Sequence, residues 1–131
     1  MLLVKTKIAM SKRHGIGLFA DQFIPKGTPT WRYDPLFDPC YTLEEVEALP
    51  EIARTTILHH AYFDKNLGKL VMPGDDLRYI NHNSKDPNIT SETTEDVASR
   101  DIEQGEEMTC DYESFEQGYF ARRNIDPRQF V

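Results

Sequence analysis

The chain is poor in cysteine and in positive charge, and it lacks any long apolar run. Its two cysteines, Cys40 and Cys110, do not have the close spacing of a zinc site or of a disulfide framework. No stretch approaches the roughly 18 apolar residues that a membrane-spanning helix needs. Against 22 Asp and Glu there are 15 Lys and Arg, so the formal net charge is −7. Direct phosphate binding needs a basic face. These absences argue against a metal site, a membrane segment and a direct nucleic-acid partner.

The length and composition fit one globular domain. At 131 residues, 39% apolar and 28% charged, the chain is large enough for one hydrophobic core but not for two. It begins Met1-Leu2-Leu3-Val4 and then turns to lysines, which does not match a signal peptide. We therefore expect an intracellular protein, cytoplasmic or nuclear, with both thiols reduced. An acidic surface attracts basic polypeptides, but many acidic domains are simply soluble, and both interpretations stay open.

Short segments dominate the expected secondary structure. Thr42 followed by Glu45 is a capping-box pattern that predicts a short helix to about Leu49, and a second helix is predicted over 51–60. Short strands separated by Gly, Pro and Asn turns are predicted over 1–9, 18–20, 28–33, 62–63, 69–72, 89–92, 96–102 and 108–112. Many short strands with two short helices predict a β-rich α+β fold.

The first segment with functional potential is Gly15-Ile16-Gly17, which follows the basic run Lys12-Arg13-His14. Two glycines one residue apart let the backbone approach a bulky ligand and allow a positive φ. A plain turn between two strands is the alternative. A dinucleotide-binding fingerprint is excluded, because the third glycine and the following helix are missing.

The second segment is Arg78-Tyr79-Ile80-Asn81-His82, with Pro87-Asn88 a few residues later. Asparagine offers two donors and an acceptor, and neutral histidine adds one of each. A buried pair of this kind must find partners. Those partners are either a ligand or neighbouring backbone that the side chains cap.

The third segment, Glu107-Met108-Thr109-Cys110-Asp111-Tyr112, carries a tyrosine hydroxyl at the end of a short alternating stretch. A lone tyrosine at a strand end is more often a core residue than a functional one. Taken alone, each of the three segments is a weak signal. Their order along the chain is more specific.

In this order the three segments resemble the signature blocks of the SET-domain protein-lysine methyltransferases. The resemblance runs from Gly15 to about Phe115 and implies a single SET domain over 1–131, without flanking zinc clusters. It implies a β-clip of small curved sheets with short helices and a C-terminal pseudo-knot. In that fold the final strand passes beneath a loop and brings Tyr112 beside Asn81 and His82.

The resemblance also implies S-adenosylmethionine as cofactor and a lysine-containing protein or peptide as substrate, with a histone tail among the candidates. One of Lys12, Arg13 and His14 is expected to bind the cofactor's carboxylate, and Asp75 matches an acidic position that precedes the second block. The expected cofactor-binding residues are Gly15, Ile16, Gly17, Arg78, Asn81, His82 and Phe115.

Tyr112 and Tyr62 are the expected catalytic residues. A lysine amine, with a pKa of about 10.4 in water, must lose its proton before methyl transfer. A dry channel beside a sulfonium lowers that pKa, and the remaining task is alignment. The resemblance places the Tyr112 hydroxyl beside the transferring methyl. It implies a lysine channel lined by Tyr62, Cys110 and Tyr119 and closed by residues 114–131.

Two features depart from the family pattern. The stretch Asn83-Ser84-Lys85-Asp86 before Pro87 is one residue longer than usual and lacks the common cysteine, so this loop is expected to be displaced. Cys110 stands where the family has Tyr or Phe, whose bulk limits the number of methyl groups added. The smaller cysteine predicts a roomier pocket that forms di- or trimethyl-lysine, although Cys110 could also be an ordinary buried thiol.

The main hypothesis is therefore an S-adenosylmethionine-dependent protein-lysine N-methyltransferase. The alternative is a catalytically inert SET-like module that binds a lysine-containing peptide or partner, and the two departures keep it open. A third hypothesis is a small regulatory domain that dimerises through its acidic surface.

Overall fold

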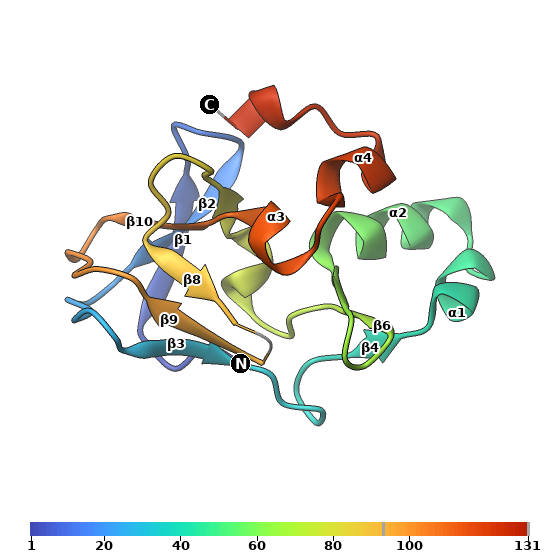
Figure 1. Ribbon diagram of the computed structural model, residues 1–131, viewed down its shortest axis with the longest axis horizontal. Helices are drawn as coiled ribbons and strands as arrows, with labels where there is room; N and C mark the ends of the chain where they lie inside the picture. The colour runs from blue at the N-terminus through green and yellow to red at the C-terminus, as the bar shows by residue number, and fades with distance from the viewer. Residues whose placement is uncertain (93, 131) are drawn as a thin grey trace.

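The computed structural model describes residues 1–92 and 94–130, which form a curled β-structure with short helices on one side (Figure 1). The strands are β1 (Thr6–Met10), β2 (Ile16–Ala20), β3 (Pro29–Arg32), β4 (Cys40–Tyr41), β5 (Tyr62–Asp64), β6 (Lys69–Val71), β7 (Asn81–His82), β8 (Ile89–Ser91), β9 (Glu95–Ala98) and β10 (Glu107–Cys110). The α-helices are α1 (Leu43–Glu47), α2 (Glu51–His60), α3 (Tyr112–Phe115) and α4 (Tyr119–Arg123), and the 3-10 helices are η1 (Asp76–Tyr79) and η2 (Pro127–Phe130). The predicted β-rich α+β class is confirmed.

The larger sheet places the last strand of the chain at its centre. Its order is β1-β2-β10-β8-β9-β3, and β7 pairs with β10 beside this path. β10 runs antiparallel to β2 and parallel to β7 and β8. The register sets Thr109 opposite Asn81 and Cys110 opposite His82. The end of β10 therefore reaches the asparagine–histidine pair directly.

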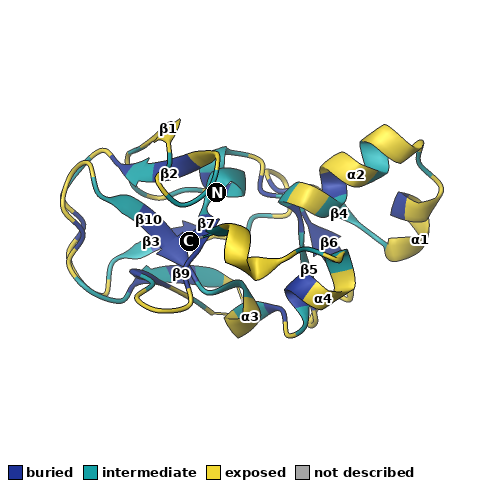
Figure 2. Cartoon of the chain, turned by 90° about the horizontal axis from the view of Figure 1, so that it is seen from above, coloured by how far each residue is buried: buried dark blue, intermediate teal, exposed yellow. Residues whose placement is uncertain are grey.

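Alternation along the strands builds the core of this sheet. Side chains two residues apart share a face. Accordingly Leu18 and Ala20 of β2 are fully buried, as is Met108 of β10. On β9 the same rule directs Asp96 inward together with Ala98, and both are buried. Figure 2 shows the buried residues concentrated in these central strands, whereas much of α1 and α2 is exposed.

A smaller sheet of order β4-β6-β5 packs with α1 and α2. Its core cluster contains Val46, Ile57 and Leu70. The predicted capping box at the start of α1 is confirmed. The hydroxyl of Thr42 accepts a hydrogen bond from the Glu45 amide at 3.1 Å, and the Glu45 carboxylate accepts one from the Thr42 amide at 2.9 Å.

One arginine fastens the C-terminal helices to the last part of α2 and to Ala61, which caps it. Arg123 donates from Nε to the Leu58 carbonyl at 3.1 Å and from Nη2 to the Ala61 carbonyl at 3.2 Å. It also forms an ion pair with Glu116, and the two side chains are only 9% and 2% exposed. These contacts hold α3 and α4 beside the smaller sheet.

Several predicted strands are shorter in the structure, and the strand predicted over 1–9 begins only at Thr6. β10 ends at Cys110 and not at Tyr112, because the Asp111 carboxylate caps α3 by accepting from the Glu113 amide at 3.1 Å. β9 ends at Ala98, and beyond it Ile102 forms only an isolated bridge to Ile24. Across residues 1–92 and 94–130, no helix has the length and apolar character needed to cross a membrane.

Candidate active site

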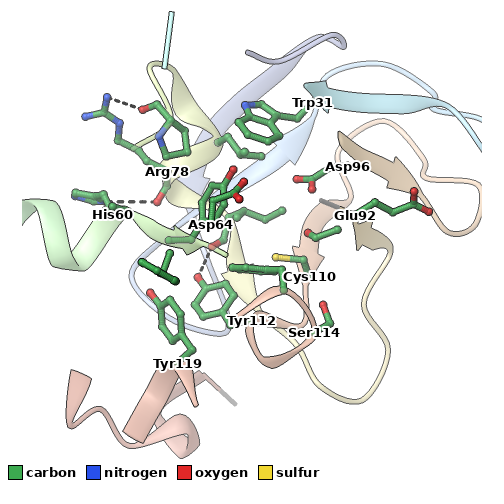
Figure 3. Close-up of a pocket in the computed structure, with 18 of the residues that line it drawn as sticks. Trp31, His60, Asp64, Arg78, Glu92, Asp96, Cys110, Tyr112, Ser114 and Tyr119 are labelled. Atoms are coloured by element: carbon green, nitrogen blue, oxygen red, sulfur yellow. Dashed lines mark hydrogen bonds between the residues drawn. The ribbon is translucent and has the colours of Figure 1, made fainter. Parts of the chain in front are cut away.

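A cavity of about 390 Å³ lies where the end of β10 meets β5, β9 and the C-terminal helices (Figure 3). A space of this size is typical of small-ligand sites. The Tyr62 ring packs edge-on against Trp31 and Phe115, with ring centroids 6.2 and 5.6 Å apart. The wall of the cavity carries the aromatic side chains of Trp31, Tyr62, Phe63, Tyr112, Phe115 and Tyr119 and the carboxylates of Asp64, Glu92 and Asp96.

Tyr112 is the first residue of α3, directly after the Asp111 cap. Its hydroxyl donates to the carbonyl oxygen of Ile80, on the segment between η1 and β7. Burial raises the pKa of Tyr112 well above its usual value, so the side chain is a neutral phenol near pH 7. Because the hydroxyl proton is donated to the Ile80 carbonyl, the lone pairs of the hydroxyl oxygen can accept a hydrogen bond from a ligand.

His82 joins β7 to the start of α3. Its Nδ1 accepts a hydrogen bond from the Tyr112 amide at 3.1 Å, which assigns the remaining proton of the neutral ring to Nε2. Burial lowers the pKa of His82, and the nearby Asp111 carboxylate opposes that shift. A neutral ring is also the form that this hydrogen bond requires.

Asn81 ties the N-terminal loop to β10. Its Nδ2 donates to the carbonyl oxygens of His14 and Ile16 at 3.0 and 3.2 Å, and to the Glu107 carboxylate at 3.0 Å. The Glu107 carboxylate also accepts from the Ser11 hydroxyl at 2.8 Å. Part of the polar capacity of Asn81 is therefore satisfied by backbone, the alternative that the sequence left open.

The two glycines of the N-terminal loop serve different needs. Gly15 has φ +49°, a left-handed conformation that favours glycine. Gly17 instead allows close approach, because a Cβ there would lie 2.4 Å from Oε1 of Glu107. The loop therefore lies directly against the side chain that Asn81 also binds.

Cys110 and Tyr62 face the same cavity from different sheets. Cys110 ends β10 and is 2% exposed, and burial raises its pKa well above the usual value. Burial likewise raises the pKa of Tyr62 on β5. Tyr119 of α4 completes this side, with its ring 4.7 Å from that of Tyr112. The residues expected to line a lysine channel, Tyr62, Cys110 and Tyr119, are therefore together, and Tyr112 joins them.

The loop that is longer than the family pattern closes on its own first side chain. The Asn83 carboxamide accepts from the amides of Lys85 and Asp86, both at 3.2 Å, and donates to the Asp86 carbonyl at 2.7 Å. After the loop, Asn88 bonds the backbone of β10 at Glu107 and Thr109, each at 2.8 Å. Asn88 therefore fastens the end of this loop to β10.

The expected cofactor-binding residues fall into two places. Arg78 and Phe115 line the cavity, whereas the other five, Gly15, Ile16, Gly17, Asn81 and His82, are not among its lining residues. The Arg78 guanidinium donates to the backbone carbonyls of Pro73 and Asp75 at 3.0 and 3.3 Å.

A second aromatic group, which the sequence did not single out, lies on the other side of Tyr112. We call it the His82 cluster, and it consists of His14, His82, Phe120 and Phe130. Phe130 of η2 lies 4.7 Å from His14 and 5.9 Å from His82 between ring centroids. Tyr112 contacts this cluster too, with its ring stacked 5.8 Å from Phe120. Tyr112 is therefore shared by the cavity and the cluster.

Asp96 is another residue that sequence reasoning missed. Burial raises the pKa of Asp96 to about 7, and its side chain lines the cavity. A signal was available, because Asp96 has the same strand parity as the apolar Ala98. No local signal announces Phe130, since its contacts with His14 and His82 are distant in sequence.

Comparison with known proteins matches the SET domain family model to residues 15–113. No curated protein matches the sequence. Among solved structures, a chain of Polycomb Repressive Complex 2 from Chaetomium thermophilum, bound to GSK126, is 18% identical with a TM-score of 0.68 and covers 98% of this chain. A candidate histone methyltransferase of Plasmodium falciparum is 20% identical with a TM-score of 0.57 and covers 85% of this chain.

The two similar structures differ in how much of each is matched. The match takes in 95% of the Plasmodium chain but only 20% of the Polycomb chain, so this protein spans about a fifth of the latter. At such identities the likeness shows a shared fold. The family match extends over most of the sequence and contains all three motif segments apart from the basic run before Gly15. The chain belongs to the SET domain family.

Proposed function

We propose that the protein is an S-adenosylmethionine-dependent protein-lysine N-methyltransferase. One observation carries the proposal. The backbone amide of Tyr112 bonds His82 Nδ1 at 3.1 Å while its hydroxyl reaches the Ile80 carbonyl, at the wall of an aromatic cavity. The Tyr112 phenol is therefore held between this cavity and the His82 cluster. Family membership supports the same reaction, since SET domains are generally protein-lysine methyltransferases.

The residues around the N-terminal loop fit the cofactor. Lys12 and Arg13 are cations suited to a carboxylate, and the ring of Phe130, tilted by 35° to that of His14, offers an aromatic face for adenine. From the sequence, Phe115 is expected to bind the cofactor, but Phe115 packs against Tyr62, whereas Phe130 lies beside this loop. We therefore assign the adenine contact to Phe130. When bound, S-adenosylmethionine supplies the methyl group carried on its sulfonium sulfur.

The chain's own residues orient the amine. The Tyr112 oxygen, with its proton engaged by Ile80, accepts from the amine and aligns it. Tyr62 and Phe115 exclude water from the cavity and favour the neutral amine by desolvation. Alignment of this kind supplies several kcal/mol of a displacement barrier, on the order of 7–11 kcal/mol at best. Because the raised pKa keeps Tyr112 neutral, it acts as a hydrogen-bonding group and not as an ionised base.

An inert peptide-binding module is the second candidate. It is favoured by one observation: the side-chain nitrogen of Asn81 donates to three protein oxygens, those of His14, Ile16 and Glu107, at 3.0–3.2 Å. A module of this kind binds a lysine-containing peptide but has no affinity for the cofactor.

Calorimetry with S-adenosylmethionine separates the two candidates. The enzyme binds the cofactor, and Asn81→Ala abolishes that binding; an inert module shows no heat up to millimolar cofactor. Radiolabelled methyl transfer to a histone-tail peptide and to a panel of basic proteins then tests catalysis. Tyr112→Phe should lower the rate about 100-fold, because the loss of a contact that aligns the reacting atoms can cost about 10²-fold. Tyr41→Phe is the matched control, because Tyr41 packs in the smaller core cluster.

A further inference from the structure

Asp96 is a buried carboxylate without a cation of its own. It is 7% exposed, and β9 pairs with β3 and β8 so that Trp31 and Ser91 lie opposite it. None of the ion pairs found within residues 1–92 and 94–130 includes Asp96. Figure 3 shows its carboxyl group turned toward the same space as Trp31 and Cys110. The Ser91 hydroxyl bonds this carboxyl but brings no charge, and buried carboxylates are usually paired with a cation or neutralised, so this position calls for a cation.

A second, independent feature indicates that this cavity binds a ligand. Oδ2 of Asp64 is buried and has no hydrogen-bond partner, although Oδ1 accepts from the amides of Asn66 and Leu67 at 2.8 and 3.0 Å. Asp64 is 4% exposed and lines the cavity. Native proteins seldom leave such a group unsatisfied.

We propose that Asp96 is the acceptor that holds the ammonium group of an incoming lysine side chain in this cavity, with the rings of Trp31 and Tyr62 as the wall beside the cation. The inference rests on the proposed function, because it takes the cavity as the entry for the substrate side chain.

The chemistry of the cavity suits a primary ammonium on an apolar stem. An ammonium has three donors and no acceptor, so it requires oxygen atoms such as those of Asp96 and Asp64. The aromatic wall accommodates the methylenes and attracts the charge through the ring faces. An ion pair favours the protonated amine. Asp96 therefore accounts for capture of the side chain, and loss of the amine proton is a later step.

At pH 8 the Asp96 side chain carries a negative charge, although burial raises its pKa. Its pKa is raised to about 7 by burial, and Ser91 and the Met1 amino group oppose the rise. Burial also raises the pKa of Cys110 and of Tyr62, and both respond to the charge of Asp96. Those two groups are neutral at pH 8, whereas the Asp96 carboxyl is mostly ionised.

The test uses Trp31, the single tryptophan of the chain, as a reporter. Its indole N–H signal is followed by ¹⁵N NMR at pH 8 during titration with n-butylammonium, which mimics the lysine side chain, and with 1-butanol as the neutral match. We expect a saturable shift with n-butylammonium in the wild type and binding weakened at least about tenfold in Asp96→Asn. Glu95→Gln is the control, since it removes the same charge from the opposite face of β9, where Glu95 pairs with Arg32 at 2.8 Å. It should bind like the wild type.

Equal affinity in wild type and Asp96→Asn overturns the inference, and so does a wild type that shows no saturable shift up to about 100 mM. If Asp96→Asn does not fold, the n-butylammonium titration is made with Asp96→Ser, for which we expect the same weakening. A 1-butanol response that follows the n-butylammonium response also overturns it, because the site then does not discriminate charge.

Methyl transfer to the histone-tail peptide distinguishes this inference from the proposed function. A wild type that binds n-butylammonium but methylates no substrate contradicts the function and leaves the inference standing. An active wild type whose peptide KM is unchanged by Asp96→Asn contradicts the inference alone. The expected result is a KM raised at least about tenfold with a smaller change in kcat.

Discussion

Arg123 and Glu116 form a buried ion pair that joins α4 to the end of α3, and the same guanidinium bonds the carbonyls of Leu58 and Ala61. The Arg123 guanidinium also lies 3.9 Å from the centroid of the Tyr119 ring. A single side chain therefore holds the helices that carry Tyr112 and Tyr119 against the last part of α2.

Removing one partner of this pair should destabilise the fold strongly. Arg123→Met leaves the Glu116 carboxylate buried without its cation, at a cost of about 3–5 kcal/mol. We expect a matching loss in the free energy of unfolding by urea and faster proteolysis after residue 111. Arg128→Met is the control, because Arg128 pairs with Asp126 at the surface. Similar losses in the two variants would contradict the prediction.

The absence of a side chain at position 17 should be required for stability. In Gly17→Ala the new methyl group meets the Glu107 carboxylate, and we expect a loss of about 1–3 kcal/mol by thermal unfolding. In a Glu107→Ala background the same change should cost clearly less, because the colliding atoms are gone. Additive losses would show that the contact with Glu107 is not the cause.

Asp96 should make stability depend on pH. Its pKa rises from 3.8 to about 7 on folding, so the folded state holds a proton that the unfolded chain releases first. The free energy of unfolding therefore falls as the pH rises from about 4 to 7 and stays low above it. The Asp96→Asn variant does not lose this free energy of unfolding as the pH rises. At pH 8 it should therefore be more stable than the wild type by up to about 4 kcal/mol. Near pH 4 the difference should disappear. Urea unfolding at both pH values checks this, and a gap independent of pH would refute it.

Phe130 and Phe115 should differ in their effect on cofactor binding. Phe130 lies against His14, whereas Phe115 packs in the cavity. Calorimetry should show that Phe130→Ala weakens S-adenosylmethionine binding about tenfold, the loss of one stacking contact of about 1.4 kcal/mol. Phe115→Ala should change the Kd by less than about twofold. If Phe115→Ala weakens S-adenosylmethionine binding more than Phe130→Ala does, the adenine contact belongs to Phe115.

Cys110 should set the number of methyl groups transferred. Its small side chain lies on the cavity wall, at the end of β10. Mass spectrometry of a saturated reaction on a lysine peptide should find di- or trimethyl-lysine. A product that stalls at monomethyl-lysine would show that the cavity is narrowed by other side chains.

Much of the fold could be predicted from local sequence. The helix over 51–60 and the capping box at Thr42 follow from local patterns, and both are confirmed. Tyr112 was predicted as a strand residue because the alternation of β10 runs on, yet the capping carboxylate of Asp111 starts a helix there. Local propensity could not decide between these two outcomes.

The candidate site was less predictable than the fold, since its parts meet through tertiary contacts. The grouping of Tyr62, Cys110, Tyr112 and Tyr119 agrees with the family motifs. The position of Phe130 depends on how η2 returns to the N-terminal loop, which no periodicity encodes. Asp96 lies inward only because the register of β9 places it there.

The central position of β10 has a consequence for synthesis of the chain on the ribosome. Met108 pairs with Leu18 of β2, and Cys110 pairs with Ile89 of β8, so this strand joins parts made much earlier. Until residue 110 has left the exit tunnel, Leu18 and Ile89 lack the strand that covers them, and exposed strand edges invite aggregation. A nascent chain therefore exposes these strand edges until residue 110 has emerged, and a product truncated before β10 lacks both this strand and the contact of Tyr112 with His82.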